Sequence, residues 1–299
     1  MDRTNFLRKS FLGTSMFVAS AAMGKVLVNG IDELKALDAT PLPDITGFNH
    51  IPHTNSKIMD NTVLHKAATR GQANHGWLNS HHSFSFANYY NPERMHFGVL
   101  RVLNDDVVAP GMGFGTHPHD NMEIISIPLS GDLEHKDSMG NIATIRHGDI
   151  QVMSAGTGIQ HSEYNRNKDA EVKFLQIWVF PNKKNVTPRY DQITLDVKDR
   201  HNTLQQILSP SANDAGVWVH QDAWFHLGAF DKEHAVDYRI KKAGNGLYAF
   251  VLKGDFDIAG TEVNDRDGFG VWDVTNVSIK ALSQNAEILL MEVPMSMNA

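Results

Sequence analysis

Short apolar segments separated by turn residues fill most of the chain from about residue 62 onward. They are rich in Val, Ile, Leu and Phe, and Gly, Asn, Asp or Pro stands near their ends, as in FGVLRVLN (97–104), EIISIPLSG (123–131), IQVMSAG (150–156) and VKFLQIWVFP (172–181). Almost no stretch combines helix length with a helical spacing of apolar residues. Short strands with frequent turn signals are typical of antiparallel barrels and sandwiches, so the chain is predicted to be all-β with few short helices.

The strand pattern repeats along the chain. IPLSGDLEH (127–135) is echoed by FVLKGDFDI (250–258), and each half closes on an apolar segment, FLQIWVFP (174–181) or EILLMEVP (287–294). A chain of 299 residues exceeds the usual size of a single core. We therefore expect two tandem jelly-roll-like antiparallel β-barrels, at residues 62–190 and 191–299.

Composition removes several classes of function. The chain has no cysteine, which excludes a disulfide frame, a thiolate metal site and a cysteine nucleophile. The formal net charge is −7 and no basic run is present, so nucleic acid is not an expected partner. Any metal must be held by nitrogen and oxygen atoms.

Two stretches carry polar residues at the spacing of side chains that share one face of a strand. GTHPHDNME (115–123) contains His117, His119 and Glu123, and SAGTGIQHSEYN (154–165) contains His161 and Glu163. Side chains alternate between the faces of a strand, so residues 117, 119, 121 and 123 point the same way if they lie in one strand. Both carboxylates then have suitable parity, and spacing alone leaves the choice between them open.

Three imidazoles and one carboxylate suit Fe(II), Mn(II), Ni(II), Cu(II) or Zn(II), and leave one or two coordination positions open. Oxygen or an oxyanion of a substrate would occupy such positions. At the repeat spacing of 123 residues, His117 and His119 correspond to Ile240 and Lys242. The second half is therefore not expected to build the same site.

The first 22 residues have the order of a secretory signal peptide. Arg8 and Lys9 precede an apolar stretch from Phe11 to Ala22, and the order Arg-Lys-Ser-Phe-Leu resembles a twin-arginine export signal with Lys9 in place of the second arginine. We expect residues 1–22 to be removed and residues 23–61 to form an arm or linker. The mature protein is then expected to be periplasmic, without stable membrane association. The alternative is an amphipathic helix retained on a cytoplasmic protein.

The two polar stretches resemble the paired motifs of the cupin superfamily, and more closely those of the pirin family. The family's hallmarks stand here as HPH (117–119), SAGTGIQHSEYN (154–165), ANHGWLNSHHSFSFANYYNP (73–92), HKDSMG (135–140) and TPRYDQ (187–192). The resemblance covers about residues 62–295 and is greatest to bacterial pirins with quercetinase-type activity. It implies a bicupin with a metal-binding N-terminal domain (62–190) and a degenerate C-terminal cupin domain (191–299).

The resemblance also implies the site and its use. The metal ligands would be His117, His119, His161 and Glu163, with Fe(II) as the expected metal, and Glu163 or Glu123 would take a substrate proton. A flavonol-like small aromatic substrate and O2 are the expected reactants. The alternative is a non-catalytic iron-binding redox sensor that acts through a protein partner. His81, His82, His96, His135 and His147 are predicted to be surface or hydrogen-bonded structural residues.

Overall fold

The computed structural model describes residues 61–297, which form 22 β-strands and two short 3₁₀ helices, η1 (Ala67–Thr69) and η2 (Val197–Arg200). The all-β prediction with few short helices is confirmed. No helix within residues 61–297 is both long and apolar enough to cross a lipid bilayer. The predicted signal peptide (1–22) and nearly all of the predicted arm (23–61) lie outside the described residues.

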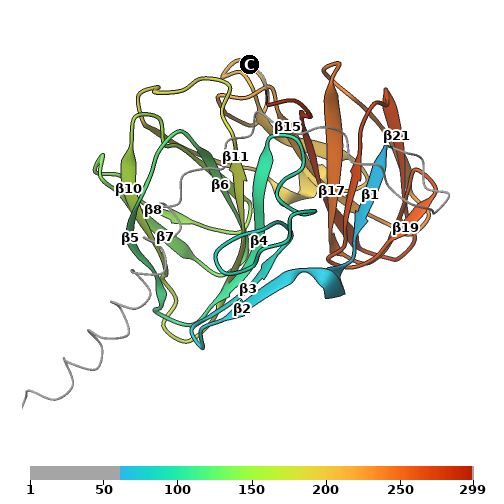
Figure 1. Cartoon of the computed structure of the whole chain (residues 1–299). Coiled ribbons are helices and arrows are strands. Elements are labelled where there is room, and N and C mark those ends of the chain that lie inside the picture. Colours follow the sequence, from blue (N-terminus) through green and yellow to red (C-terminus); the bar gives the residue numbers. More distant parts are fainter. Residues whose placement is uncertain (1–60, 298–299) are drawn as a thin grey trace, which may run out of the picture.

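The N-terminal half contains a seven-stranded sheet and a four-stranded sheet (Figure 1). The larger sheet has the order β12 (Arg189–Thr194), β9 (Asp149–Ser154), β6 (Glu123–Ser130), β11 (Val172–Val179), β4 (Leu100–Val108), β3 (Leu78–His82), β2 (Gly71–Asn74). The smaller sheet has the order β5 (Gly113–His119), β10 (Ile159–Asn165), β7 (Leu133–Asp137), β8 (Ile142–Ile145).

The C-terminal half repeats this arrangement, which confirms the expected pair of cupin-like domains. Its larger sheet has the order β1 (Thr62–His65), β20 (Gly268–Val271), β17 (Asn245–Lys253), β22 (Ala286–Pro294), β15 (Trp224–Phe230), β13 (Leu204–Ser209), β14 (Val217–Trp218). Its smaller sheet has the order β16 (Ala235–Arg239), β21 (Asn276–Ala281), β18 (Phe256–Ile258), β19 (Thr261–Val263). Among the strands within residues 61–297, only β13 and β14 pair in parallel, and the isolated bridge between His201 and Ala229 is also parallel.

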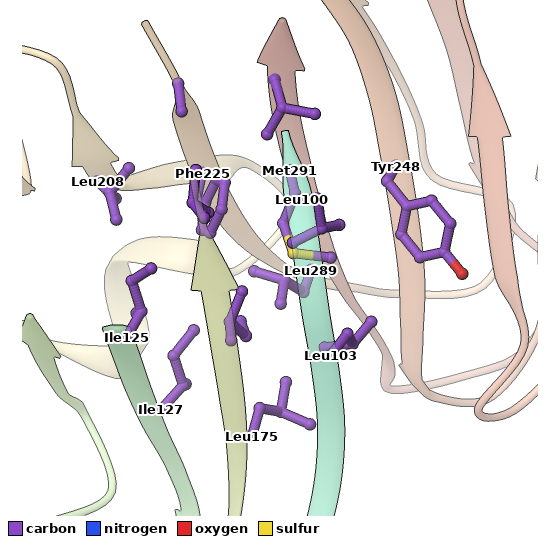
Figure 2. Packing of buried hydrophobic residues seen from close by; sticks show 14 of the residues in the cluster. Leu100, Leu103, Ile125, Ile127, Leu175, Leu208, Phe225, Tyr248, Leu289 and Met291 are labelled. Atoms are coloured by element: carbon purple, nitrogen blue, oxygen red, sulfur yellow. The ribbon is translucent and has the colours of Figure 1, made fainter. Parts of the chain in front are cut away.

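The largest hydrophobic cluster lies between the two seven-stranded sheets and joins the two halves (Figure 2). Strand β11 shows why its sequence is almost continuously apolar. Leu175 and Ile177 face this shared core, whereas Val172 and Phe174 pack inside the N-terminal half. A strand that is buried on both faces needs apolar residues at both parities.

The first strand of the fold belongs to the sheet of the other half. In Figure 1 the blue β1 lies among the red strands of the C-terminal half, and Thr62 to His65 pair with Val271 to Gly268 of β20. Strand β12 in turn pairs with β9 of the N-terminal half, so the expected boundary between residues 190 and 191 falls inside a strand. The free edge of a sheet accepts any strand that reaches it, and local sequence does not decide which one does.

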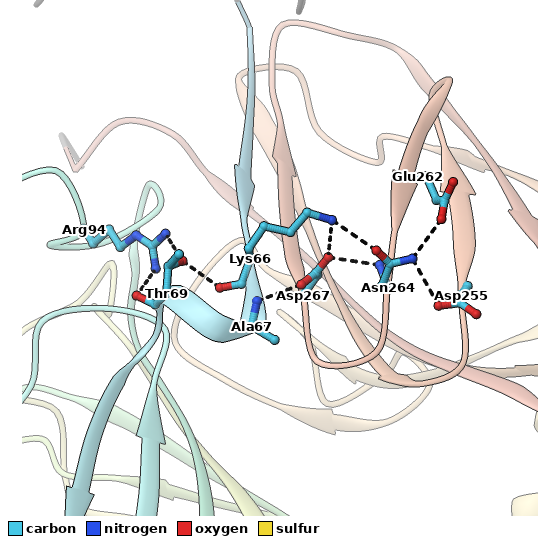
Figure 3. A network of polar contacts seen from close by, with 8 residues as sticks. All are labelled: Lys66, Ala67, Thr69, Arg94, Asp255, Glu262, Asn264 and Asp267. Atoms are coloured by element: carbon cyan, nitrogen blue, oxygen red, sulfur yellow. Dashed lines mark hydrogen bonds and ion pairs between the residues drawn. The ribbon is translucent and has the colours of Figure 1, made fainter.

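A polar network holds β1 and η1 against the C-terminal half (Figure 3). Asp267 accepts hydrogen bonds from the Ala67 backbone amide at 2.7 Å and from Lys66 Nζ at 2.8 Å. Lys66 Nζ also donates to Asn264 at 3.2 Å. These bonds fix the turn that precedes β20.

Candidate metal centre

Strands β5 and β10 bring the predicted histidines together inside the N-terminal half. The register places His161 directly opposite His117, and His119 lies two residues further along β5, opposite Ile159. The ring centroids are 4.4 Å apart for His117 and His161, 4.9 Å for His117 and His119, and 5.0 Å for His119 and His161. One ring nitrogen from each lies within 4.8 Å of the others, which is the spacing of a shared cation site.

Burial keeps these three imidazoles neutral at pH 7. Each side chain is at least nine-tenths buried. Burial lowers the pKa of His119 to about 3, and it also lowers the pKa values of His117 and His161. Neighbouring imidazoles lower the pKa of His161 further. Neutral imidazoles keep a lone pair, which is the form that binds a metal.

Hydrogen bonding leaves nitrogen lone pairs available. His117 Nδ1 lies 2.7 Å from the carbonyl oxygen of Gly115, so Nδ1 donates there and Nε2 is free to act as a ligand. Neither ring nitrogen of His161 has a hydrogen-bond partner within residues 61–297, although both are buried. Buried polar atoms are rarely left without a partner, and a bound ion is one of the ordinary explanations. The donor set therefore fits a divalent transition metal.

Glu163 lies next to this group, held by residues of the facing sheet. Its Oε1 accepts a hydrogen bond from Ser126 Oγ at 3.1 Å, and its Oε2 accepts one from Gln176 Nε2 at 2.9 Å. Burial raises the pKa of Glu163 to about 7, and these two bonds partly oppose the increase. Glu163 shares a possible cation group with His161 and His135, and a bulge separates it from His161 in the pairing with β5.

His135 is the residue whose position the sequence reasoning missed. It lies on β7 directly opposite Glu163 and is fully buried, with its ring centroid 5.3 Å from that of His161 and 4.8 Å from that of Tyr190. Its Nε2 is 3.5 Å from Asp137 Oδ2. The motif HKDSMG could have indicated this position, because alternation puts His135 on the same strand face as Asp137. Only the strand order, however, places both residues beside β10.

The expectation that Glu123 shares a strand face with His117 and His119 is wrong. The chain turns between β5 and β6, with Asn121 at φ 45°, so strand parity does not extend from His119 to Glu123. On β6 the side chain of Ser126 reaches Glu163, whereas Ile125 and Ile127, which have the parity of Glu123, face the other half. Glu123 instead accepts a hydrogen bond from Ser154 Oγ at 2.8 Å, and the backbone of His220 also donates to it.

Aromatic side chains border the imidazoles on one side. The Trp178 ring meets His119 edge to face at 4.9 Å and Phe86 at 5.4 Å. Trp178 and Phe86 are only partly buried. Ser126, Gln176 and Trp178 were not singled out in the sequence, although a polar residue at an inward position of an otherwise apolar strand is itself a signal.

Comparisons with known proteins agree with this geometry. Residues 63–179 match the family model described as Pirin, and residues 206–293 match the one described as Quercetinase C-terminal cupin domain. The chain is 46% identical over 231 residues to the quercetin 2,3-dioxygenase of Escherichia coli strain K12, which covers 77% of this chain and 98% of that relative. It is 37% identical over 223 residues to a pirin-like protein of Caulobacter vibrioides, covering 74% of this chain and 95% of that relative.

Solved structures give the same result. The structure of YhhW from Escherichia coli has a TM-score of 0.74 at 45% identity and covers 78% of this chain and 97% of that chain. The structure of the bacterial pirin YhhW in complex with nickel(II), also from Escherichia coli, has a TM-score of 0.73 at 45% identity, covering 78% of this chain and 99% of that chain. The motifs, the fold and these matches agree, and the chain belongs to the pirin family.

Proposed function

We propose that the protein is a metal-dependent dioxygenase of the quercetin 2,3-dioxygenase type, which uses O2 to open a ring of a flavonol-like substrate. The observation that carries the proposal is the buried group of three neutral imidazoles beside Glu163. Relatives that are 46% identical and carry the name quercetin 2,3-dioxygenase support the reaction class.

His117, His119, His161 and Glu163 are the proposed ligands of one divalent transition metal. Fe(II) is the proposed metal, with Mn, Ni, Cu and Zn as alternatives, because nitrogen and oxygen donors accept all of them. The nickel complex of the related pirin supports a divalent metal in this fold. When bound, the metal supplies Lewis acidity that lowers the pKa of a substrate hydroxyl.

Glu163 is the proposed proton acceptor. Burial raises the pKa of this carboxyl group, which favours proton uptake, whereas a bound cation would lower that pKa, so Glu163 would take the proton only through an oxygen that the metal does not hold. Ser126 and Gln176 each bond to one carboxylate oxygen, which orients the group and leaves a lone pair on each oxygen for the metal or the substrate proton. Glu123, the other predicted acid–base residue, has no part in this proposal because its contacts are with Ser154 and His220.

Trp178 and Phe86 are proposed to hold the flat rings of the substrate. Their edge-to-face packing continues the wall formed by His119, and aromatic faces bind planar ligands through offset contacts. A substrate hydroxyl aimed at the imidazoles would then lie within reach of Glu163. This arrangement supports a small aromatic substrate rather than a nucleic acid.

The test is to load the purified protein anaerobically with Fe(II), Mn(II), Ni(II), Cu(II) or Zn(II), add a flavonol, and admit air. We expect at least one metal form to bleach the flavonol absorption band and consume O2 in proportion. The variants His117→Ala and Glu163→Gln should lose this activity, whereas the surface control His201→Ala should keep it. Absence of O2 uptake with every metal would refute the proposal, and redox-dependent capture of a protein partner without turnover would favour a sensor.

For location, we propose export to the periplasm through residues 1–22, with retention in the cytoplasm as the alternative. Arg8 and Lys9 ahead of an apolar stretch support this proposal. Cell fractionation with N-terminal sequencing of the recovered protein tests it. A double variant Arg8→Gln, Lys9→Gln should stay in the cytoplasm uncleaved, and an unchanged distribution would contradict export.

A further inference from the structure

A cavity lies where the two halves meet, separate from the imidazole group. Its volume is about 180 Å³, and its walls come from β6 and β9 of the N-terminal half and from η2, β15, β17, β22 and the turn before β20 of the C-terminal half. None of the possible cation ligands of the metal centre lines it. Typical pockets for drug-sized molecules hold about 300–1,000 Å³, so this cavity suits a smaller ligand.

Arg200 is the unusual residue of this cavity. Its side chain is buried at 7% exposure, and its Nε has no hydrogen-bond partner within residues 61–297. Glu287 also lines the cavity and favours the charged form of Arg200 electrostatically, but no ion pair within 4.0 Å joins the two in the described chain. The buried Nε has lost its hydration without gaining a hydrogen bond, which costs free energy, and an anionic acceptor placed beside it would remove that cost.

Two further cations border the same space. Lys253 is exposed and lies at the mouth of the cavity. Arg266 lines it from the turn that Asp267 fixes through Lys66 and the Ala67 amide (Figure 3), and the Arg266 guanidinium pairs with Asp105 at 3.4 Å. Three basic residues from three separate elements of the C-terminal half therefore line one space.

The carboxylates of the cavity do not neutralise these cations. Asp149 already accepts hydrogen bonds from Thr194 Oγ1 at 2.6 Å, Gln192 Nε2 at 3.0 Å and the Arg146 amide at 2.8 Å. Three cations (Arg200, Lys253, Arg266) and two anions (Asp149, Glu287) line the cavity, and Arg266 is already paired with Asp105. Within residues 61–297 the side chains of Arg200 and Lys253 make no hydrogen bond or ion pair, so an added anion would find two cations without bonded acceptors.

Apart from His147, the remaining walls are mostly aliphatic, and include Ile127 and Leu129 from one half and Leu227 and Leu252 from the other. We propose that this cavity binds a small monocarboxylate with a short apolar body, whose carboxylate pairs with Arg200 and whose body packs between the two halves. A guanidinium and a carboxylate form paired, charge-assisted hydrogen bonds, which fixes the orientation of the ligand. Because the ligand contacts both halves, it stabilises their association.

The test uses the full-length, metal-loaded protein and benzoate as the probe. Benzoate binding is measured by titration calorimetry and by the shift in melting temperature. We expect saturable binding of one benzoate per chain and a higher Tm. Arg200→Gln should lower the affinity by at least about tenfold, since the charge-assisted contact is lost. The control is Arg239→Gln, which removes an exposed arginine of β16 that does not line the cavity.

Two further variants and one uncharged ligand complete the test. His161→Ala should still bind benzoate, which separates this cavity from carboxylate binding at the metal centre and from the proposed dioxygenase function. Lys253→Gln, at an exposed position that does not threaten folding, should weaken binding by roughly threefold. Benzyl alcohol, which lacks the charge, should not bind.

The proposal is overturned by any of three results. These are no saturable benzoate binding up to about 10 mM, equal affinity in the wild-type, Arg200→Gln and Lys253→Gln proteins, or tighter binding of inorganic phosphate than of benzoate. The last result would assign the cavity to a different class of anion.

Discussion

The two four-stranded sheets have the same strand order, yet they turn different side chains toward their facing sheets. In the N-terminal half, β5, β10 and β7 contribute His117, His119, His161, Glu163 and His135 to the interior. In the C-terminal half, the matching β16, β21 and β18 contribute Tyr238, Val277, Ile279, Ala281, Phe256 and Ile258 to a hydrophobic cluster. The same sheet arrangement thus holds a polar site in one half and a hydrophobic core in the other. Strand pairing determines the arrangement, and the inward-facing residues determine the chemistry.

Buried carboxylates show the same contrast. Glu292 in the C-terminal half is fully buried and accepts bonds from the Tyr238 hydroxyl, the amides of Lys241 and Lys242, and Asn245 Nδ2. Glu163 has two side-chain donors and faces imidazoles. A carboxylate that is saturated with donors is structural, whereas one with lone pairs to spare is available to a ligand.

The sharpest test of this comparison removes one buried histidine from each half. His161→Ala should lower the metal affinity, and the dioxygenase rate at limiting metal, by more than about 100-fold, since a direct ligand matters more than the groups around it. Metal content and O2 uptake measure the effect. His226→Ala is the matched control, because His226 is 5% exposed and burial lowers its pKa to about 4. Equal loss of bound metal in both variants would contradict the assignment of the metal site to the N-terminal half.

A second test exchanges the two carboxylates for amides. Glu292→Gln should lower the free energy of unfolding by about 3 kcal/mol, because an amide group cannot accept all of the bonds that Glu292 accepts. Glu163→Gln should leave the metal-free protein close to wild-type stability while weakening metal binding. Urea unfolding of both metal-free variants provides the measurement. Similar losses of stability would show that Glu163 is as structural as Glu292.

A third test concerns Glu123, which faces the junction of the halves. Burial raises its pKa from 4.5 to about 7, so between these values the folded protein keeps a proton that the unfolded chain has released. The free energy of unfolding should therefore fall as pH rises from 4.5 to 7, by up to about 3 kcal/mol, and stay level above pH 7. Glu123→Gln removes this contribution.

The difference in unfolding free energy between metal-free wild type and Glu123→Gln, followed from pH 4.5 to 7.5, isolates this one group from Glu163. Parallel profiles would contradict the assignment. The variant should also keep dioxygenase activity within about twofold, and a larger loss would restore Glu123 to the catalytic machinery.

The smallest expected effect comes from a matched pair of buried strand serines. Ser126 Oγ bonds to Glu163 and Ser209 Oγ bonds to the Ser211 carbonyl, both at 3.1 Å. Ser126→Ala and Ser209→Ala should each lower the free energy of unfolding by about 1 kcal/mol. Only Ser126→Ala should also weaken metal binding, by roughly tenfold, because it orients a proposed ligand. A metal titration of both proteins decides the matter.

Much of the fold was predictable because strand formation and inward parity are local properties. The alternating HPH and HSE stretches place His117 with His119, and His161 with Glu163, on common faces whatever the rest of the chain does. The turn between β5 and β6 shows the limit of this reasoning. A single reversal of direction removed Glu123 from the face that simple counting assigned to it.

The amino-acid sequence by itself determined the all-β class, the exclusion of thiolate chemistry and the two polar pairs, since composition and alternation along a strand need no distant partner. Tertiary structure alone decided that β5 lies beside β10, that His135 lies opposite Glu163, that β1 joins the other half, and that Arg200 lines a cavity between the halves. These features depend on which distant segments pair and pack, and that choice reflects the free energy of the whole core rather than any local preference.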